Sequence, residues 1–263
     1  MHPYLAIVSA RIRMLLQYRG AALGGMSTQL FWGLIRVMVF EAFYRSSTAS
    51  QPMTYPEVVN YVWLGQALFA MLPWSIDQEI RGKIRDGSVA YELVRPLDLY
   101  NFWFSRALAT RLAPTVLRSV PILIIAVLFF DLQLPASPAA AGAWLLTTIG
   151  ALLLSCAISN LISISLMWTI AGEGVVSLAQ ASIFVFSGMI VPLPLFPDWS
   201  HPLLDVLPFR GLVDLPFRLY MGHIPAREVL GVLGHQLLWT AVLVVLGRWL
   251  LARGTRRLVV QGG

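Results

Sequence analysis

Charge is scarce in this sequence. Only 12% of the 263 residues are Asp, Glu, Lys or Arg, whereas 57% are hydrophobic and the mean hydropathy is +0.72. An ordinary soluble domain carries about 25% charged residues, so this composition excludes that class. A helix needs about 20 apolar residues to cross a bilayer, and the apolar runs of this chain are long enough for six crossings.

Lysine and cysteine are almost absent. The single lysine, Lys83, is followed by Ile84, so the chain lacks the glycine-rich loop ending in Lys and Ser or Thr that holds ATP phosphates. The single cysteine, Cys156, excludes a disulfide within the chain and a cysteine metal site. No G-x-S-x-G or H-E-x-x-H motif occurs, and His201 and Asp205 form only an isolated pair. We therefore expect no enzyme activity and no metal here, and any ATP use must belong to a separate protein.

The apolar runs predict an all-α fold, a polytopic membrane protein forming one transmembrane domain over residues 1–263. Residues 1–19 place apolar side chains at helical spacing, with Arg11 and Arg13 on other faces, which predicts an interfacial helix. A cleaved signal peptide is the alternative, but the apolar stretch that follows is too long for a signal core. The six expected spans are 21–44, 57–78, 104–130, 141–169, 175–196 and 227–250.

Basic residues indicate the orientation, because they stay preferentially on the cytoplasmic side. With the N-terminus in the cytoplasm, the basic residues outside are only Arg45, Arg210, Arg218 and Arg227, and Arg36 lies within a span. Both termini are expected in the cytoplasm. Because the basic residues cluster at the ends of apolar runs, they indicate topology and not nucleic-acid binding. The fourteen expected on the cytoplasmic side are Arg11, Arg13, Arg19, Arg81, Lys83, Arg85, Arg95, Arg106, Arg111, Arg118, Arg248, Arg253, Arg256 and Arg257.

The segment 77–98, DQEIRGKIRDGSVAYELVRPLD, carries nine of the chain's 32 charged side chains. Its pattern predicts a short helix that breaks at Gly87, a second helical stretch over 89–94 and a stop at Pro96. A solvated loop that only enforces orientation is one interpretation. The other is a docking element, because apolar residues such as Ile80 and Leu93 would give the loop a face for a partner.

Polar residues inside the expected spans allow two interpretations. Ser155, Ser159 and Ser163 recur every fourth residue, which favours close helix packing. The alternative is a polar lining of a transport route, to which Asn60, Gln66, Asn160 and Gln180 would also contribute.

Arg36 and the proline-rich segment 187–225 also depart from a plain apolar span. The simplest explanation for an arginine at position 36, within a span, is that its side chain extends outward to water. A contact with substrate or partner is the alternative. Prolines break the helical ladder, so we expect broken or re-entrant helices in the outer leaflet before the last span. An extramembrane loop is the other possibility for this segment.

These features together resemble type-2 ABC transporter permeases, the membrane subunits of ATP-driven exporters. The resemblance covers the whole chain and rests most on GSVAYELVRPLDLYNFWFSRALA, residues 87–109, and SGMIVPLPLFPDW, residues 187–199. It implies that residues 77–101 form a cytoplasmic coupling loop and residues 197–226 an extracytoplasmic hairpin. The residues implied at the ATPase contact are Glu79, Arg81, Lys83, Arg85, Asp86, Glu92, Arg95 and Asp98.

The resemblance further implies two ATPase chains, a second permease that is identical or related, and surrounding lipid. ATP and Mg²⁺ would bind the ATPase partner, and this chain would hold no cofactor. Pro192, Pro194 and Pro197 would shape an outer gate. The implied activity is export of a small amphipathic drug, lipid or peptide across a bacterial inner membrane. An ion- or proton-coupled transporter is the alternative, although its usual acidic residues at mid-span are missing.

Overall fold

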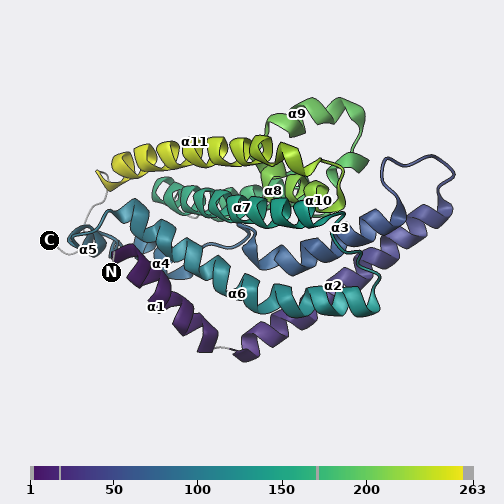
Figure 1. Ribbon diagram of the computed structural model, residues 1–263. Helices are drawn as coiled ribbons and strands as arrows, with labels where there is room; N and C mark the ends of the chain where they lie inside the picture. The colour runs from purple at the N-terminus through teal and green to yellow at the C-terminus, as the bar shows by residue number, and fades with distance from the viewer. Residues whose placement is uncertain (1–2, 18, 170–171, 257–263) are drawn as a thin grey trace.

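Helices account for all regular structure in the described part of the chain. The computed structural model describes residues 3–17, 19–169 and 172–256, and no strand occurs there (Figure 1). The expected all-α fold is therefore confirmed. In chain order the helices are α1 (Pro3–Gln17), α2 (Arg19–Ser46), α3 (Tyr55–Leu68), η1 (Phe69–Met71), α4 (Gln78–Arg85), α5 (Ala90–Leu93), α6 (Leu99–Phe129), α7 (Pro138–Ser165), η2 (Leu166–Trp168), α8 (Glu173–Phe186), η3 (Leu193–Leu195), η4 (Asp198–Ser200), α9 (His201–Val206), η5 (Pro208–Leu212), α10 (Asp214–Met221), η6 (Ala226–Glu228) and α11 (Val229–Thr255).

The helix α7 lies at the centre of the bundle. It packs against α6, α10 and α11, and Ala151, Leu154 and Ile164 along it are fully buried (Figure 1). A helix that is apolar on all sides is expected to be buried in this way. The flanking helices α6 and α11 instead leave large apolar side chains uncovered, such as Phe129 at 72% and Leu230 at 76% exposure.

Three helices of the described residues are long and apolar enough to cross a membrane: Leu99–Phe129, Pro138–Trp168 and Ala226–Thr255. They correspond to the spans expected at 104–130, 141–169 and 227–250. The helix α2 has 28 residues and thus sufficient length. The helices α3 and α8 have 14 residues each, fewer than the roughly 20 that one straight crossing needs. The count of six spans is therefore not established by helix length alone.

Local chemistry explains why α3 and α8 are short. After η1, Leu72 adopts extended backbone with ψ 147°, as the residue before a proline prefers, here Pro73. The helix α8 ends just before Gly188, whose φ of +86° lies in the left-handed region that glycine tolerates. A Cβ at Gly188 would also collide with the Tyr61 hydroxyl of α3. The helical run of α3 and η1 and the helix α8 thus end at backbone features that the apolar content of their sequences does not show.

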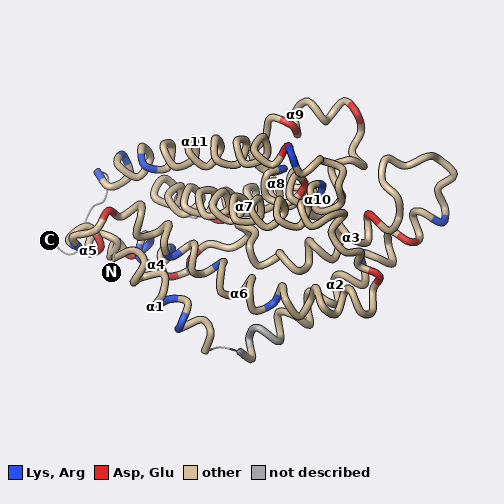
Figure 2. Tube along the Cα trace, in the orientation of Figure 1, with Lys and Arg blue, Asp and Glu red and all other residues tan. Residues whose placement is uncertain are grey.

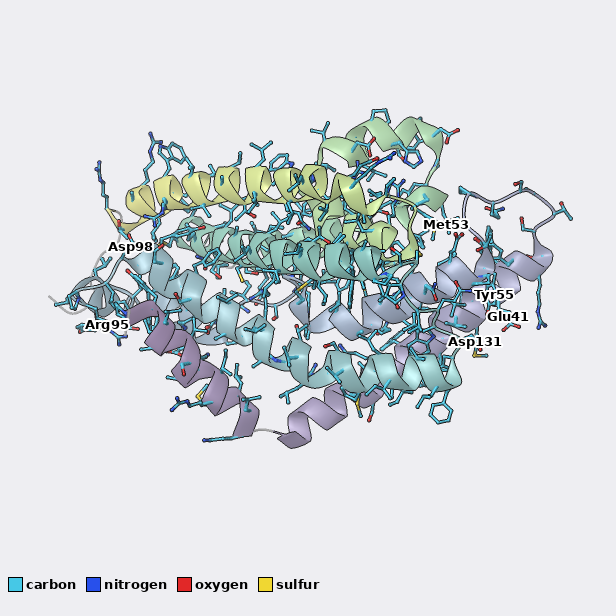
Figure 3. All side chains as sticks on the ribbon, viewed as in Figure 1. Glu41, Met53, Tyr55, Arg95, Asp98 and Asp131 are labelled. Atoms are coloured by element: carbon cyan, nitrogen blue, oxygen red, sulfur yellow. The ribbon has the colours of Figure 1, made fainter. Side chains whose placement is uncertain are left out.

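One end of the molecule gathers α4, α5, the beginning of α1 and the end of α11 (Figure 1). Basic residues concentrate towards this end (Figure 2), and Arg95 and Asp98 lie there, opposite Glu41, Tyr55 and Asp131 (Figure 3). The cytoplasmic location of this end, expected from the basic residues, stays a prediction. Arg257, one of the residues in that count, lies outside the described residues, as do 1–2 and 18 of the expected interfacial helix 1–19.

The proline-rich segment before α11 is broken into short helices, as the sequence predicts. It contains η3, η4, α9, η5 and α10, and α9 stands out from the bundle (Figure 1). Within it η5 and α10 pack against α7, and Phe217 of α10 meets Tyr61 edge-on at 5.1 Å between ring centroids. The hairpin is therefore fixed to the core, while its depth in a bilayer remains a prediction.

Candidate functional site

The segment 77–98 folds into two helices joined by a glycine turn. Asp77 begins α4 as its N-cap, with its carboxylate accepting from the backbone N–H groups of Glu79 and Ile80 at 3.0 and 3.4 Å. The helix ends at Arg85, and Gly87 adopts a φ of +76°. The helix break expected at Gly87 is confirmed. The second predicted stretch is observed as α5.

Apolar contacts seat this segment on the bundle. Ile80 is 3% exposed and packs with Val89, Leu99 and Trp103, the last two from the first turns of α6. Burying one such side chain stabilises the packing by about 1.5–3 kcal/mol. The segment therefore docks on its own protein and is not a free loop.

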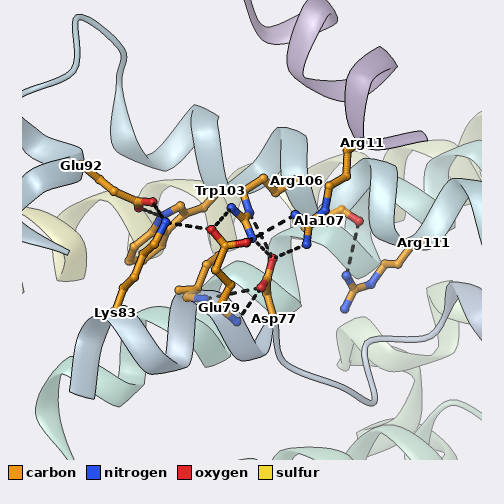
Figure 4. A network of polar contacts seen from close by, with 10 residues as sticks. Arg11, Asp77, Glu79, Lys83, Glu92, Trp103, Arg106, Ala107 and Arg111 are labelled. Atoms are coloured by element: carbon orange, nitrogen blue, oxygen red, sulfur yellow. Dashed lines mark hydrogen bonds and ion pairs between the residues drawn. The ribbon is translucent and has the colours of Figure 1, made fainter. Parts of the chain in front are cut away.

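Arg106 of α6 is the centre of a charged network between α6 and α4 (Figure 4). Its side chain is 7% exposed and donates to Asp77 from Nε at 3.1 Å and from Nη2 at 2.8 Å. The same guanidinium donates to Glu79 from Nη1 at 2.9 Å. Arg11 of α1 approaches both carboxylates, at 3.6 Å from Asp77 and 3.4 Å from Glu79. Three helices, α1, α4 and α6, are therefore joined through two carboxylates.

A second branch of the network runs to α5 through Lys83. Its ammonium lies 2.8 Å from Glu79 and 2.7 Å from Glu92 (Figure 4). Glu92 is only 3% exposed, and its other oxygen accepts from the indole N–H of Trp103 at 2.8 Å. The buried carboxylate of α5 thus has two donors, which offset the cost of its burial.

The electrostatics of the network favour its charged form. Hydrogen bonds from Arg106 hold the pKa of the Glu79 carboxyl well below its usual range. Partial burial opposes the charge of Lys83, but hydrogen bonds to Glu79 and Glu92 raise the pKa of its ammonium. Glu79 and Lys83 therefore stay ionised near neutral pH, which keeps the ion pairs of α4 with α5 and α6 intact.

Two further ion pairs connect the same segment to other helices. Arg81 of α4 pairs with Glu173 at the start of α8, with 2.9 Å between nitrogen and oxygen. Asp98, the N-cap of α6, lies 3.5 Å from Arg248 of α11. Both pairs are at least partly exposed and contribute little to stability on their own. They nevertheless place α8 and α11 in contact with the charged segment.

The outward side of the segment carries uncovered apolar and charged residues. Tyr91 is 72% exposed, Leu93 46% and Val94 82%. Arg95 is exposed and lies over the Phe102 ring at 5.5 Å. We call this surface the docking face, and it consists of Arg85, Asp86, Tyr91, Leu93, Val94 and Arg95.

The eight residues predicted at the ATPase contact therefore divide into two groups. Arg85, Asp86 and Arg95 belong to the docking face. The other five pair within the chain and hold that face in place: Glu79, Arg81, Lys83, Glu92 and Asp98. Their contact with a partner stays a prediction.

Sequence reasoning missed the central roles of Arg106, Trp103 and Arg11. Arg106 entered the sequence analysis only as a topology marker. Its position at the beginning of an apolar run was an available signal, since a charge there is costly unless a partner compensates it. The partner, Asp77, lies 29 residues earlier, so the sequence did not identify the pair.

The serine stripe of α7 serves contacts within the chain. Ser155 accepts from Nε of Arg111 of α6 at 3.1 Å, and Ser159 also accepts from this guanidinium. Ser163 donates to the Ser159 carbonyl, and Asn160 donates to the Tyr100 carbonyl at 3.3 Å. All four predicted residues are buried, which agrees with the packing interpretation. A transport role for them stays a prediction.

The other predicted pathway residues lie apart from this stripe. Asn60 exchanges hydrogen bonds with Gln133, and Gln180 donates to the Trp74 carbonyl. Gln66 lines a cavity of about 720 Å³ between α2, α3 and α8. The structure therefore does not bring the predicted set into one continuous lining.

The predicted gate prolines and the pair of His201 and Asp205 lie in the proline-rich segment before α11. Pro192 precedes η3, which contains Pro194, and Pro197 precedes η4. His201 contacts the Phe196 carbonyl, and Asp205 pairs with Arg210. No group of three His, Cys, Asp or Glu side chains with metal-binding geometry occurs among the residues that the structure describes.

Comparison with protein families decides the class of protein. Residues 30–262 match the sequence profile of a family described as ABC-2 family transporter protein. The chain belongs to this family. No curated protein and no solved structure matches the chain.

Membership of the ABC-2 family confirms the resemblance to type-2 ABC permeases. An ABC-2 family member is the multi-pass membrane subunit of an ABC transporter and not its catalytic subunit. Its partner is an ABC ATPase subunit. The charged segment 77–98 is accordingly the candidate site of contact in this ABC-2 protein.

Proposed function

We propose that this chain is the permease subunit of an ABC exporter that moves a small amphipathic molecule across the bacterial inner membrane. A separate partner subunit hydrolyses the ATP and binds the Mg²⁺. The observation that carries this proposal is the rigid seating of α4 and α5 on α6 through Arg106, Lys83 and Trp103, with the docking face left uncovered.

The network suits the transmission of force from a partner. A partner that grips the docking face moves α4 and α5, and Arg106 carries this movement to α6 because its bonds hold α4 directly. The pairs through Arg11, Arg81 and Asp98 extend the movement to α1, α8 and α11. Closure of two ATPase chains would thus rock several spanning helices together.

The proposed assembly has two permeases, identical or related, and two ATPase chains. In it α1 lies at the cytoplasmic interface and both termini face the cytoplasm. The six spans comprise α2, α3 with η1, α6, α7 with η2, α8 with the segment after it, and α11. The re-entrant hairpin 197–226 closes the outer exit together with Pro192, Pro194 and Pro197.

Co-purification tests this function. The tagged chain is extracted gently from its native membrane, its partners are identified by mass spectrometry, and ATP hydrolysis is measured. We expect a stoichiometric soluble ATPase, with hydrolysis lost when the phosphate-binding lysine of that partner is replaced. A chain that purifies alone and without hydrolysis contradicts the proposal.

A further inference from the structure

A cavity with a volume of about 720 Å³ lies between α2, α3, α8 and the segment 189–195. Its wall is mainly apolar and aromatic, with Trp32, Phe40, Phe69 and Phe184 among the lining residues. Cavities of about 300–1,000 Å³ with a few placed polar groups are typical of sites for small molecules. The polar side chains of this wall are Thr28, Gln29, Arg36 and Gln66.

Gln29 of α2 lacks a hydrogen-bond partner although it is buried. Its side chain lines the cavity, the residue is 4% exposed, and neither its amide oxygen nor its amide nitrogen has a partner. A buried polar group without a partner costs about 1–3 kcal/mol, and a molecule bound in the cavity would remove this cost. Gln29 can both donate to and accept from a ligand in this cavity.

Arg36 lies seven residues further along α2, on the same side of the helix. Its Nη2 donates to the Ile190 carbonyl at 2.8 Å. None of the ion pairs that the described residues form includes Arg36, although its guanidinium carries five donor hydrogens. A charged group next to an apolar wall is costly unless an opposite charge lies close to it. The cavity therefore presents a positive group whose natural partner is an acid from outside the chain.

The spacing of the two side chains limits the shape of the ligand. Seven residues of helix correspond to about 10 Å along the axis. One small head group does not reach both positions, but an elongated molecule with a polar group at each end does. The aromatic residues of the wall, such as Trp32 and Phe69, would then cover its apolar body.

We propose that this cavity binds an anionic amphiphile: a molecule with a carboxylate or phosphate at Arg36, an apolar body along the aromatic wall, and a neutral hydrogen-bonding group at Gln29. The site follows from the geometry of this chain alone. The statement that this ligand is also the exported cargo rests on the proposed function.

The cavity is open on one side, because Trp32 is 54% and Ile190 51% exposed. A ligand can thus enter laterally, from lipid or from a second permease that faces this side. Free amphiphiles and anionic lipids share the required acid group. The experiment has to distinguish these two sources, and also a groove that is simply covered by a second copy of the chain.

The test uses the purified chain in nanodiscs of neutral phosphatidylcholine. The probes are dansyl-aminooctanoic acid and its methyl ester, which differ in the negative charge and in one methyl group, and binding is followed by dansyl fluorescence. We compare the acid-to-ester affinity ratio of the wild type with that of Arg36→Gln. The two probes partition into the lipid to the same extent with either protein, so this contribution cancels in the comparison. We expect the wild-type ratio to exceed the variant ratio about tenfold, as for loss of one charge-assisted contact.

Two further variants make the comparison specific. Arg45→Gln removes another arginine of α2, which is 79% exposed and paired with Glu41, and should leave the ratio unchanged. Gln29→Leu should weaken the acid and the ester about equally, since both keep the dansyl sulfonamide, by about fivefold. Phosphatidylglycerol in the nanodisc repels the acid from wild type and Arg36→Gln alike. It should bring the acid-to-ester ratio of the wild type closer to that of Arg36→Gln if the natural ligand is an anionic lipid, and leave the difference between the two ratios unchanged if it is a free amphiphile.

Equal acid-to-ester ratios in wild type and Arg36→Gln overturn the proposal, and a groove covered by a second copy gives this result. The binding assay needs no ATPase, so the two proposals fail separately. A chain with the acid preference but without an ATPase partner refutes the exporter and leaves the site standing. An active ATPase complex without the acid preference refutes the site alone.

Discussion

Arg106 of α6 holds the Glu79 carboxylate of α4 through both terminal nitrogens of its guanidinium. Such a two-point contact fixes orientation as well as distance, because the planar fork matches the carboxylate. Since the same guanidinium also binds Asp77, the N-cap of α4, one buried side chain determines where α4 begins and how it lies on α6.

Replacement of Arg106 by Gln should destabilise the protein by about 3 kcal/mol. This is the lower end for a buried ion pair that loses one partner, since the Glu79 side chain is 44% exposed. Chemical denaturation in detergent measures the change. Arg45→Gln, which removes an arginine that is 79% exposed, is the control and should change stability by less than about 0.5 kcal/mol. Equal effects of both changes contradict a structural role for Arg106.

The contribution of Glu79 should depend on pH in a defined direction. Because its pKa is lowered on folding from an ordinary value of 4.5, the stabilisation is complete above pH 4.5 and decreases as the pH falls towards the folded value. The stability difference between the wild type and Glu79→Gln should therefore be constant from about pH 5 to 8 and shrink below that range. Glu173→Gln, which removes a carboxylate that is 76% exposed, should differ little from the wild type throughout. A difference that grows on acidification is the opposite of this expectation.

Trp103→Phe should loosen α5 by about 2 kcal/mol, because the buried Glu92 carboxylate loses its indole donor and the smaller phenyl ring leaves a void at a fully buried site. Trp199, at 80% exposure, supplies the matched control Trp199→Phe. Limited proteolysis near residues 88–96, together with denaturation, measures the change. Indistinguishable cleavage in both variants shows that Glu92 needs no second donor.

Arg85→Ala should weaken partner binding without unfolding the chain, because Arg85 is exposed and belongs to the docking face. Glu79→Ala should instead leave partner binding largely intact and reduce the coupling of ATP hydrolysis to export, since it acts through Arg106 and Lys83. Pull-down and hydrolysis assays distinguish the two. Normal export by both variants shows that the contact has been assigned to the wrong residues.

Local features of the charged segment were predictable from sequence, whereas its anchoring was not. Gly87 and Pro96 predict the helix break and the end of the segment through backbone preferences that need no tertiary information. The bond between Arg106 and Asp77 joins residues 29 positions apart, and it exists only because α4 folds back onto α6. Sequence patterns show the structural preferences of residues that are close in the chain. They do not show contacts between residues that are far apart in it.

The same distinction applies to the spans. Apolar content correctly predicted α6, α7 and α11, because their runs continue without a break of the backbone. It did not show that α3 and α8 have only 14 residues, although Pro73 follows the end of η1 and Gly188 follows the end of α8. Likewise the spacing of Ser155 and Ser159 indicated a helix contact, but their partner Arg111 comes from another helix.

The most direct test of the account is co-purification of the ATPase partner with a variant of the docking face. Val94, at 82% exposure on this face, is changed to Asp, and Leu203, at 56% exposure on α9, which lies away from α4 and α5 (Figure 1), is changed to Asp as the control. We expect the Leu203→Asp chain to keep a stoichiometric ATPase and the Val94→Asp chain to lose it, with both chains equally stable. Full retention of the ATPase by Val94→Asp contradicts the assignment of this face as the contact.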